Sequence, residues 1–486
     1  MLEYVPYAAG ISAAALVVFA GGRWFRRSAW RLGLIDGPKL RGVHAEPVAK
    51  SGGMTIAAAL VASLLAQMIA ARALGLDGAY LTDIDHLYLL LPALAIAGLG
   101  LMDDLHPLGA AAKLLVQGAA GTVAWFLSFK IGGVGAGAAS LMLPDTLSLP
   151  VTVVFIVAVT NAYNMIDGVD GLCSGAAFIA LVGIGLFAAG AGEFRLELAL
   201  PLGAAALAFM RFNFGKPKAF LGDSGSMLLG FLIATLALRA VVTPAGAIDV
   251  IPLFLLLSLP IVDITFVFFR RLIQGASPLR ADRGHIHHIL LLLFEGNSLR
   301  TTLTLLFMGA LGAAGAMWFK LNTNGGELTA VQAVLAGAAI ALPLGLYYAV
   351  YAMGGYASWH NLRNAGAATD AAMAMADAGA ESGAVAGLTD AALIDWMALT
   401  DVTAIALFDD DGNRVWSAGV PDPGHEALNI PLYASGRVRR GRLVLQGPGR
   451  AGALAFAAHL LLPLYPVFME LLALRAPELA TADTRA

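Results

Sequence analysis

The residues of this sequence that could do chemistry gather in the segment NAYNMIDGVDGL, which begins at Asn161. Asn161, Asn164 and Asp167 follow one another at intervals of three, which places them on one face if the helix continues. Apolar runs at 149–160 and 176–190 flank the segment. Because charged groups at membrane depth are costly and usually functional, we predict a site at the end of a membrane span rather than a merely acidic interfacial loop.

Two further polar clusters fit the same chemistry. Asp103 and Asp104 end an apolar run, and adjacent carboxylates attract a divalent cation or poise one member as a base. Lys113 follows them, where it can meet an anion by charge. The segment FLGDSGS combines glycines, whose backbone N–H groups can approach a phosphate, with Asp223, a hard oxygen donor for Mg²⁺.

A third additional cluster, GHIHH, holds His285, His287 and His288 and is preceded by Arg280 and Arg283. Three histidines could bind zinc, but alternating and adjacent histidines do not share one helix face. With arginines beside them, binding of a pyrophosphate is the better interpretation. The carboxylate and amide oxygens of the other clusters suit Mg²⁺ better than zinc.

The composition indicates a membrane protein. Of the 486 residues, 59% are hydrophobic and 13% are charged, whereas soluble domains carry about 25% charged residues. The net charge of −3 gives no indication of nucleic-acid binding, and one cysteine, Cys173, excludes an internal disulfide. We predict an all-α polytopic membrane protein with about eleven transmembrane helices and a small C-terminal cytoplasmic α/β extension. The expected spans lie near 5–22, 54–74, 86–102, 112–130, 148–165, 174–191, 198–213, 225–242, 249–270, 300–318 and 328–352.

Lysines and arginines in short loops predict the orientation. The loop after the first span, GGRWFRRSAWRLGLIDGPKLRGVHAEPVAK, is strongly basic, so we expect it in the cytoplasm and the N-terminus outside. No basic region precedes the first apolar run, which favours a membrane span over a cleaved signal. Alternation then puts every polar cluster, and the C-terminus, on the cytoplasmic side. We therefore expect the clusters to form one site at the cytoplasmic face.

The composition changes from about residue 365, where an Ala/Gly-rich stretch begins. Beyond it, TAIALFDDDGNRVWSAG is typical of a strand, an Asp-Gly turn and a strand, and GRVRRGRLVLQG of a second hairpin or strand pair. The apolar stretch 453–474 predicts a helix, and residues 409–411 fit a solvated turn better than a metal site. We divide the chain into a transmembrane domain at 1–355, a linker at 356–388, an α/β extension at 389–475 and a disordered tail at 476–486.

Five motifs, in this order, resemble those of the polyprenyl-phosphate N-acetylhexosamine-1-phosphate transferases, over about residues 30–350: DGPKLRGVHAEPVAKSGG, DDLHPLGAAAKLLVQ, NAYNMIDGVDGL, FLGDSGS and ADRGHIHH. The resemblance implies transfer of a sugar 1-phosphate from a UDP-N-acetylhexosamine to undecaprenyl phosphate, with release of UMP. It implies Mg²⁺, or alternatively Mn²⁺, as the cofactor and the bacterial inner membrane as the location. Family members are often dimeric, and the sequence leaves the oligomeric state and the sugar open.

The resemblance also implies roles for single residues. Asp223 and Asn164 would be Mg²⁺ ligands, and Asp103 would be the base or orienting group for the lipid phosphate. Asp104 and Asp167 would support the metal and the diphosphate. The donor would be contacted by Asp170 and Phe220 at the uracil, by Lys113 at the diphosphate, and by Arg283, His285, His287 and His288 at the sugar and diphosphate.

The sequence departs from the family pattern in three places. The segment PVAKSGG stands where the family often has Pro-Arg-x-Gly-Gly, so Lys50 keeps the charge of arginine without its fork. The segment HIHH, in place of the HHHFE of peptidoglycan translocases, favours an N-acetylglucosamine-type donor over UDP-MurNAc-pentapeptide. The C-terminal extension has no counterpart in the minimal pattern, and regulation or docking of the next glycosyltransferase are two hypotheses for it.

A membrane transporter is the main alternative class, because intramembrane acids and broken helices also mark ion pathways. A transporter predicts polar residues across the depth of the membrane, whereas these crowd at the expected cytoplasmic ends. A catalytically inactive scaffold would be expected to lack one of the acids or the histidine segment, and the sequence keeps all of them.

Overall fold

The computed structural model is predominantly helical and falls into two compact units, which we describe separately. The first, the helical unit, comprises Met1–Asp36, Val48–Ile264 and Ser298–Leu346, and the remaining segments form the C-terminal unit. The structure describes residues 4–37, 47–76, 84–136, 139–188, 196–215, 217–243, 245–273, 285–294, 296–323, 330–353, 364, 367–368, 371–372, 374–376, 390–400, 402–409, 411–422, 425–433, 439–447, 457, 464 and 467–468.

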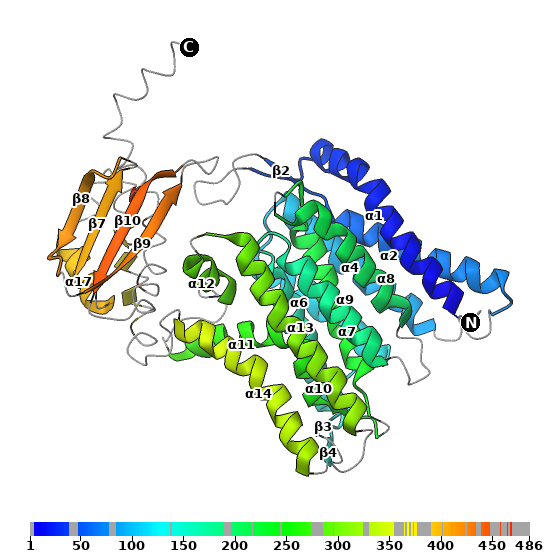
Figure 1. The fold of residues 1–486 in the computed structure, drawn as a ribbon. Coiled ribbons are helices and arrows are strands. Elements are labelled where there is room, and N and C mark those ends of the chain that lie inside the picture. Colours follow the sequence, from blue (N-terminus) through cyan, green and yellow to red (C-terminus); the bar gives the residue numbers. More distant parts are fainter. Residues whose placement is uncertain are drawn as a thin grey trace. The chain divides into compact units, whose positions relative to one another are not determined.

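Helix α9 (Gly222–Ala240) is the centre of the helical unit. Every residue of this helix is buried except Asp223 and Arg239, which are half-buried. A helix that is apolar on all sides must be covered on all sides. Four helices supply that cover (Figure 1): α2 (Gly52–Ala73), α4 (Ile84–Leu105), α6 (Asp145–Ile166) and α7 (Leu172–Ala188).

An outer layer packs against these helices, with α1 on α2 and α8, α5 on α4 and α6, and α13 on α7 and α10. Among the described residues, further helices are α1 (Val5–Leu32), α5 (Ala110–Phe126), α8 (Leu196–Asn213), α10 (Val250–Leu256), α11 (Ser258–Ile273), α12 (Ile286–Leu293), α13 (Ser298–Thr323), α14 (Ala330–Met353) and α17 (Asp390–Thr400).

Six helices of the described chain are long and apolar enough to cross a membrane, and the α10–α11 pair makes a seventh candidate. Large apolar side chains such as Leu91, Phe126 and Val154 are exposed on the outside of the bundle, as expected where lipid covers the surface. The protein is therefore a polytopic membrane protein.

The span expected near 249–270 is divided into two helices, because α10 and α11 meet at a 92° bend. Pro260 explains the break. It stands in the first turn of α11, where a proline is tolerated, but its ring would clash with the carbonyl of Leu256 if α10 continued through it.

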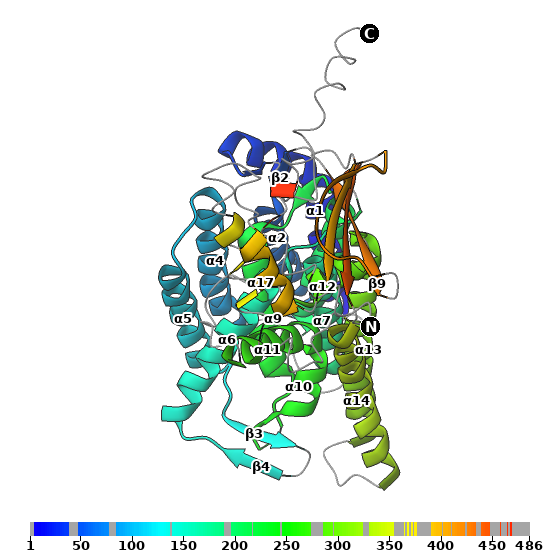
Figure 2. The same cartoon turned by 90° about the vertical axis from the view of Figure 1, so that its left-hand side faces the viewer.

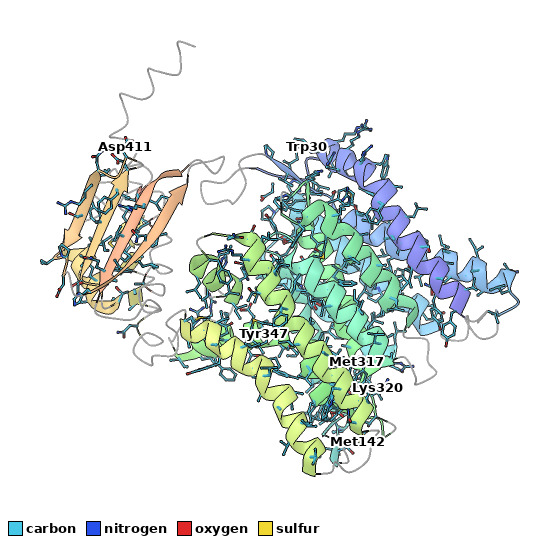
Figure 3. The ribbon with its side chains drawn as sticks, viewed as in Figure 1. Trp30, Met142, Met317, Lys320, Tyr347 and Asp411 are labelled. Carbon is cyan, nitrogen blue, oxygen red and sulfur yellow. The ribbon has the colours of Figure 1, made fainter. Side chains whose placement is uncertain are left out.

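Two small three-stranded sheets, which we did not predict, lie at opposite ends of α9 (Figure 2). In each, an antiparallel pair is extended by a parallel strand that leads directly into a helix: β5 into α9, and β6 into α10. Trp30, near the first sheet, and Met142, in the second, mark these two ends in Figure 3. The strands are β1 (Ile35–Asp36), β2 (Val48–Lys50) and β5 (Ala219–Phe220) in one sheet, and β3 (Gly133–Ala136), β4 (Ala139–Met142) and β6 (Ile248–Asp249) in the other.

The C-terminal unit contains a four-stranded antiparallel sheet in the order β8-β7-β10-β9. The expected turn joins β7 (Ala404–Asp409) to β8 (Arg414–Gly419), with Gly412 at φ 86°. The prediction for the next segment is wrong, because β10 (Arg439–Gly447) is a single strand whose partners are β7 and β9 (Glu426–Tyr433). The linker, the helix expected at 453–474 and the tail lie largely or wholly outside the described residues.

Candidate active site

The first turn of α9 is capped by a carboxylate from another helix. Asp104, near the end of α4, accepts hydrogen bonds from the backbone N–H groups of Asp223 and Ser224, each at 3.1 Å. The residue at the N-cap position, Leu221, has no side-chain acceptor. A carboxylate in this position satisfies unpaired N–H groups and interacts favourably with the helix dipole.

The counter-charge of this carboxylate is Lys50, whose Nζ lies 3.2 Å from Asp104 Oδ1. The Asp104 side chain is fully buried, so it needs that partner. Burial acts to lower the pKa of Lys50, but the ion pair with Asp104 outweighs it and the pKa is raised, with Asp36 and Asp223 adding to the effect. Lys50 is therefore charged at physiological pH.

Glycines allow α2 and α4 to approach the start of α9 closely. A Cβ on Gly53 would overlap Ser224 Oγ, and a Cβ on Gly100 would overlap the backbone of Ser224. Gly222 itself has φ +73° and lies against the Asp104 carboxylate. The glycines in PVAKSGG and FLGDSGS thus serve the contact between helices.

Asp223 is the most exposed of the carboxylates that form ion pairs here. Its side chain is 34% exposed, against 6% for Asp103 and 0% for Asp104. Lys113, at the start of α5, pairs with Asp103 Oδ2 and places its Nζ 3.5 Å from Asp223 Oδ2. The other oxygen of Asp103 accepts a hydrogen bond from Leu108 N at 2.7 Å. Asp103 thus holds Lys113 beside the exposed carboxylate.

The polar residues of α6 divide between two tasks. Asn164 donates from Nδ2 to Ser226 Oγ at 3.0 Å, which ties α6 to α9 next to Asp223. Asn161 instead donates to Gln117 Oε1 at 2.7 Å and joins α6 to α5. Asp167 directly follows the helix. Burial raises the pKa of Asp167 well above its usual range, and the Asp223 and Asp104 carboxylates raise it further.

The loop after α6 is held by residues that the sequence reasoning missed. Asn213, 3% exposed, accepts from Gly171 N at 2.8 Å and donates to Ala219 O at 3.1 Å, so it joins this loop to β5. Thr302 of α13 donates to the backbone oxygen of Asp170 at 2.9 Å. The sequence offered one hint, because Asn213 is a polar residue at the end of an apolar run, shortly before FLGDSGS.

The helical unit thus brings together Asp103, Asp104, Lys113, Asn164, Asp167 and Asp223, with Asp170 in the adjoining loop and Phe220 on the strand before α9. The histidines belong to the C-terminal unit, where His285 directly precedes α12 and His287 and His288 lie in its first turn. The rings of His285 and His287 are stacked, with centroids 5.7 Å apart. Arg283 lies outside the described residues.

The exposed donors of the cluster are oxygen atoms, which suits Mg²⁺. Within the described ranges, no group of three or more histidine, cysteine, aspartate or glutamate side chains converges as a closed metal cage. Mg²⁺ does not require such a cage, since it keeps several waters and is usually held by one or two carboxylates together with substrate phosphates. The solvent-facing Asp223, with the Asn164 carboxamide beside it, fits that kind of open site.

Comparisons with known proteins identify relatives of this chain. A sequence model of glycosyl transferase family 4 matches residues 86–241, from α4 through α9. The decaprenyl-phosphate N-acetylglucosaminephosphotransferase of Mycobacterium tuberculosis strain H37Rv is 31% identical over 69% of this chain and 88% of its own length. The enzyme of the same name from Mycolicibacterium smegmatis is 32% identical over 64% of this chain and 82% of its own.

A third relative comes from Bacillus subtilis. Its probable undecaprenyl-phosphate N-acetylglucosaminyl 1-phosphate transferase is 31% identical over 55% of this chain and 72% of its own length. With such identity over most of the length of each relative, and with the matched region containing Asp103, Asn164 and Asp223, this chain belongs to glycosyl transferase family 4.

Proposed function

We propose that the protein transfers N-acetylglucosamine 1-phosphate from UDP-N-acetylglucosamine to undecaprenyl phosphate, giving undecaprenyl-diphospho-N-acetylglucosamine and UMP. The observation that carries the proposal is the cluster at the start of α9, where Asp223, an accessible carboxylate, lies beside Lys113 and Asn164. Relatives from three organisms are named for transfer of N-acetylglucosamine phosphate to a polyprenyl phosphate, which supports the same reaction here.

The reaction is a single displacement at phosphorus. An oxygen of the lipid phosphate attacks the sugar-linked phosphorus of the donor, and the bond from that phosphorus to the UMP oxygen breaks. Asp223 and Asn164 would hold Mg²⁺, which would neutralise the diphosphate and the charge that develops on the leaving UMP. The half-buried Lys113 adds a fixed positive charge beside Asp223, where the donor phosphates would bind.

The buried acids support this arrangement from behind. Both oxygens of Asp103 are already occupied, one by a hydrogen bond from Leu108 N and the other by the ion pair with Lys113. A role in orienting Lys113 and the lipid phosphate therefore suits Asp103 better than proton abstraction. Near neutral pH much of a phosphate monoester is already doubly ionised, and the attack then needs no base. Asp167, whose pKa is raised by burial and by the Asp223 carboxylate, supports the cation, and Asp170 and Phe220 contact the uracil.

Five further features belong to the proposal. We count eleven spans, namely the six long apolar helices, the bent pair, the three shorter apolar helices and α5. In the bacterial inner membrane, the start of α9 faces the cytoplasm, the N-terminus lies outside and the C-terminus inside. We assign binding of the sugar and diphosphate to His285, His287, His288 and Arg283, as the family resemblance implies. The protein acts as a homodimer. The extension beyond residue 365 regulates the enzyme or docks the next glycosyltransferase.

The test is an assay of the purified protein in detergent with Mg²⁺ and undecaprenyl phosphate. UDP-N-acetylglucosamine, UDP-N-acetylgalactosamine and UDP-MurNAc-pentapeptide are offered separately, and UMP and lipid-linked product are quantified. We expect UMP from the first donor, loss of activity with EDTA, and a fall of about 1,000-fold or more in Asp223→Ala, which removes charge from the reacting site.

Turnover of a different UDP-N-acetylhexosamine would keep the reaction and correct the sugar. Failure to bind UDP, together with no UMP from any donor, would contradict the proposal. Repeating the assay with decaprenyl phosphate shows how the enzyme ranks the two acceptors, since the relatives are named for one or the other.

A further inference from the structure

The strand that ends at Lys50 is tied by its backbone to the start of α9. Lys50 is in register with Phe220 in the parallel pair of β2 and β5, two residues before α9 begins. Its own N–H donates to Leu34 O at 2.9 Å, and Gly53 N donates to Leu221 O at 3.0 Å. These contacts hold the Lys50 backbone in a set position beside the first turn of α9.

The side chain of Lys50 reaches the same turn by a second route. Its Nζ lies 3.2 Å from Asp104. Both carboxylate oxygens of Asp104 accept hydrogen bonds from that turn, from the backbone N–H groups of Asp223 and Ser224. Because the Asp104 side chain is fully buried, solvent cannot replace Lys50 as its partner. The contacts thus run from Lys50 through Asp104 to the residue that carries the exposed carboxylate.

We infer that Lys50 is a positioning residue for the reaction, which acts through Asp104 to fix the first turn of α9 and thereby the direction in which Asp223 presents its carboxylate. This role rests on the proposed function, because it assumes that Asp223 holds the cation. It differs from the role of Lys113, which lies beside Asp223 itself. Asp104 is a positioning residue by the same reasoning, in place of the metal-supporting role that the family resemblance suggested.

Two other roles for Lys50 make different predictions. If Lys50 contacted the donor, its loss would raise KM for the UDP-sugar, and the loss would not depend on Asp104. If it only reduced the negative potential of the site, its removal would strengthen cation binding, since an opposing charge would be gone. A positioning role instead weakens cation binding, because Asp223 is no longer held in place.

The experiment uses the full-length protein purified in detergent, with Mn²⁺ binding followed by electron paramagnetic resonance alongside the UMP assay. A matched control removes the lysine of an exposed ion pair, Lys130 with Asp145, whose side chains are 36% and 72% exposed. Size-exclusion profiles and unfolding temperatures establish that each protein is folded. The variants are Lys50→Met, Lys50→Arg, Asp104→Asn, Lys50→Met with Asp104→Asn, and Lys130→Met.

For Lys50→Met we expect kcat to fall about 30-fold while KM for the donor changes less than about threefold, the pattern of a lost transition-state arrangement. Mn²⁺ affinity should fall about tenfold, and Lys50→Arg should recover kcat to within about threefold, since arginine keeps the charge. In the Asp104→Asn background, Lys50→Met should cost less than about threefold, because residues that act through one another are not additive. Lys130→Met should match the wild type in every measurement.

Three results would overturn the inference: tighter Mn²⁺ binding in Lys50→Met, a fully additive double variant, or a change confined to the donor KM. These readouts also separate this inference from the proposed reaction. If the wild type bound Mn²⁺ but turned over no donor, the reaction would fail while the Mn²⁺ titrations still decided the role of Lys50. If the wild type bound no Mn²⁺, the inference would fail with its premise that Asp223 holds the cation, and the unfolding temperatures would report only on the ion pair of Lys50 with Asp104.

Discussion

The two small sheets at the ends of α9 are built alike and differ in how they cap the helix that follows. At one end, β5 leads into α9, whose first N–H groups are satisfied by Asp104 from α4. At the other, β6 leads into α10, whose N-cap residue, Asp249, accepts from Ile251 N at 3.1 Å with its own side chain. The chain thus satisfies the same requirement locally at one end and from a distant segment at the other.

The difference explains where the reactive carboxylate comes from. A helix that supplies its own cap uses its first carboxylate internally, as α10 uses Asp249. Because Asp104 performs that task for α9, Asp223 in its first turn is left partly exposed beside Lys113 and Asn164. Capping from another helix is also less tolerant of change, since it requires α4, β2 and α9 to meet in one arrangement.

The largest expected difference is between variants that remove the capping carboxylates of α9 and α10. We expect Asp104→Ala to lower kcat about 100-fold or more and to destabilise the fold by about 2–4 kcal/mol, because the variant loses a buried ion pair as well as a cap. Asp249→Ala should cost only about 1 kcal/mol and leave turnover near wild type, since it removes a cap alone.

UMP release and the apparent unfolding temperature in detergent measure both effects. Equal losses of activity in the two variants would mean that the carboxylate from α4 serves α9 no differently from an ordinary N-cap.

The sequence was enough to select the polar residues that the structure brings together here, but not the contacts that hold them. Runs of apolar residues and ordered polar motifs were enough to predict a membrane protein and to select Asp103, Asn164 and Asp223, because these signals lie within single segments. The cap on α9 joins residues 119 and 120 positions apart, and no local pattern encodes such a pairing. Two-residue strands such as β5 cannot be predicted from the sequence either, since they are too short to show an alternating pattern.

The same limit applies to the bend and to the C-terminal sheet. Pro260 was visible, but whether a proline starts a new helix or kinks an existing one depends on what packs around it. Strands β7 and β8 followed from a local Asp-Gly turn, whereas the pairing of β10 with both β7 and β9 depends on contacts between separate segments.

Two glycines of α4 allow a test of whether the packing of α4 against α9 positions Asp223. They are two residues apart and have different surroundings. A Cβ on Gly100 would overlap the backbone of α9 at Ser224 and Asp223, whereas Gly98 has open space. Gly100→Ala should therefore destabilise the protein by about 1–3 kcal/mol through overpacking and lower kcat by displacing Asp223. Gly98→Ala should leave activity unchanged and stabilise the helix by up to about 1 kcal/mol.

Unfolding temperatures and UMP release on the two variants provide the measurement. Wild-type turnover in Gly100→Ala would indicate that the position of α9 against α4 does not govern Asp223.

The smallest effect is expected at the locally capped end and depends on pH. Burial raises the pKa of Asp249 above its ordinary value of 3.8, although the hydrogen bond from Ile251 N acts against the rise. The folded state therefore binds this proton more tightly than the unfolded chain, so the contribution of Asp249 is fully favourable below about pH 3.8 and is lost as pH rises through the raised value. Asp249→Asn keeps an oxygen for the cap and removes the charge.

Above that window the variant should unfold at a temperature up to about 3 °C higher than the wild type, and the difference should disappear toward pH 4. The matched change at Asp145, 72% exposed in the first turn of α6, should produce no such pH-dependent difference. A lower unfolding temperature for Asp249→Asn at neutral pH would show that the charge itself stabilises α10, through the helix dipole, by more than its burial costs. In that case α10 would depend on the charge of Asp249, as α9 depends on the charge of Asp104. The two helix starts would then differ only in the origin of the capping carboxylate, which is the N-cap residue itself in α10 and a residue of another helix in α9.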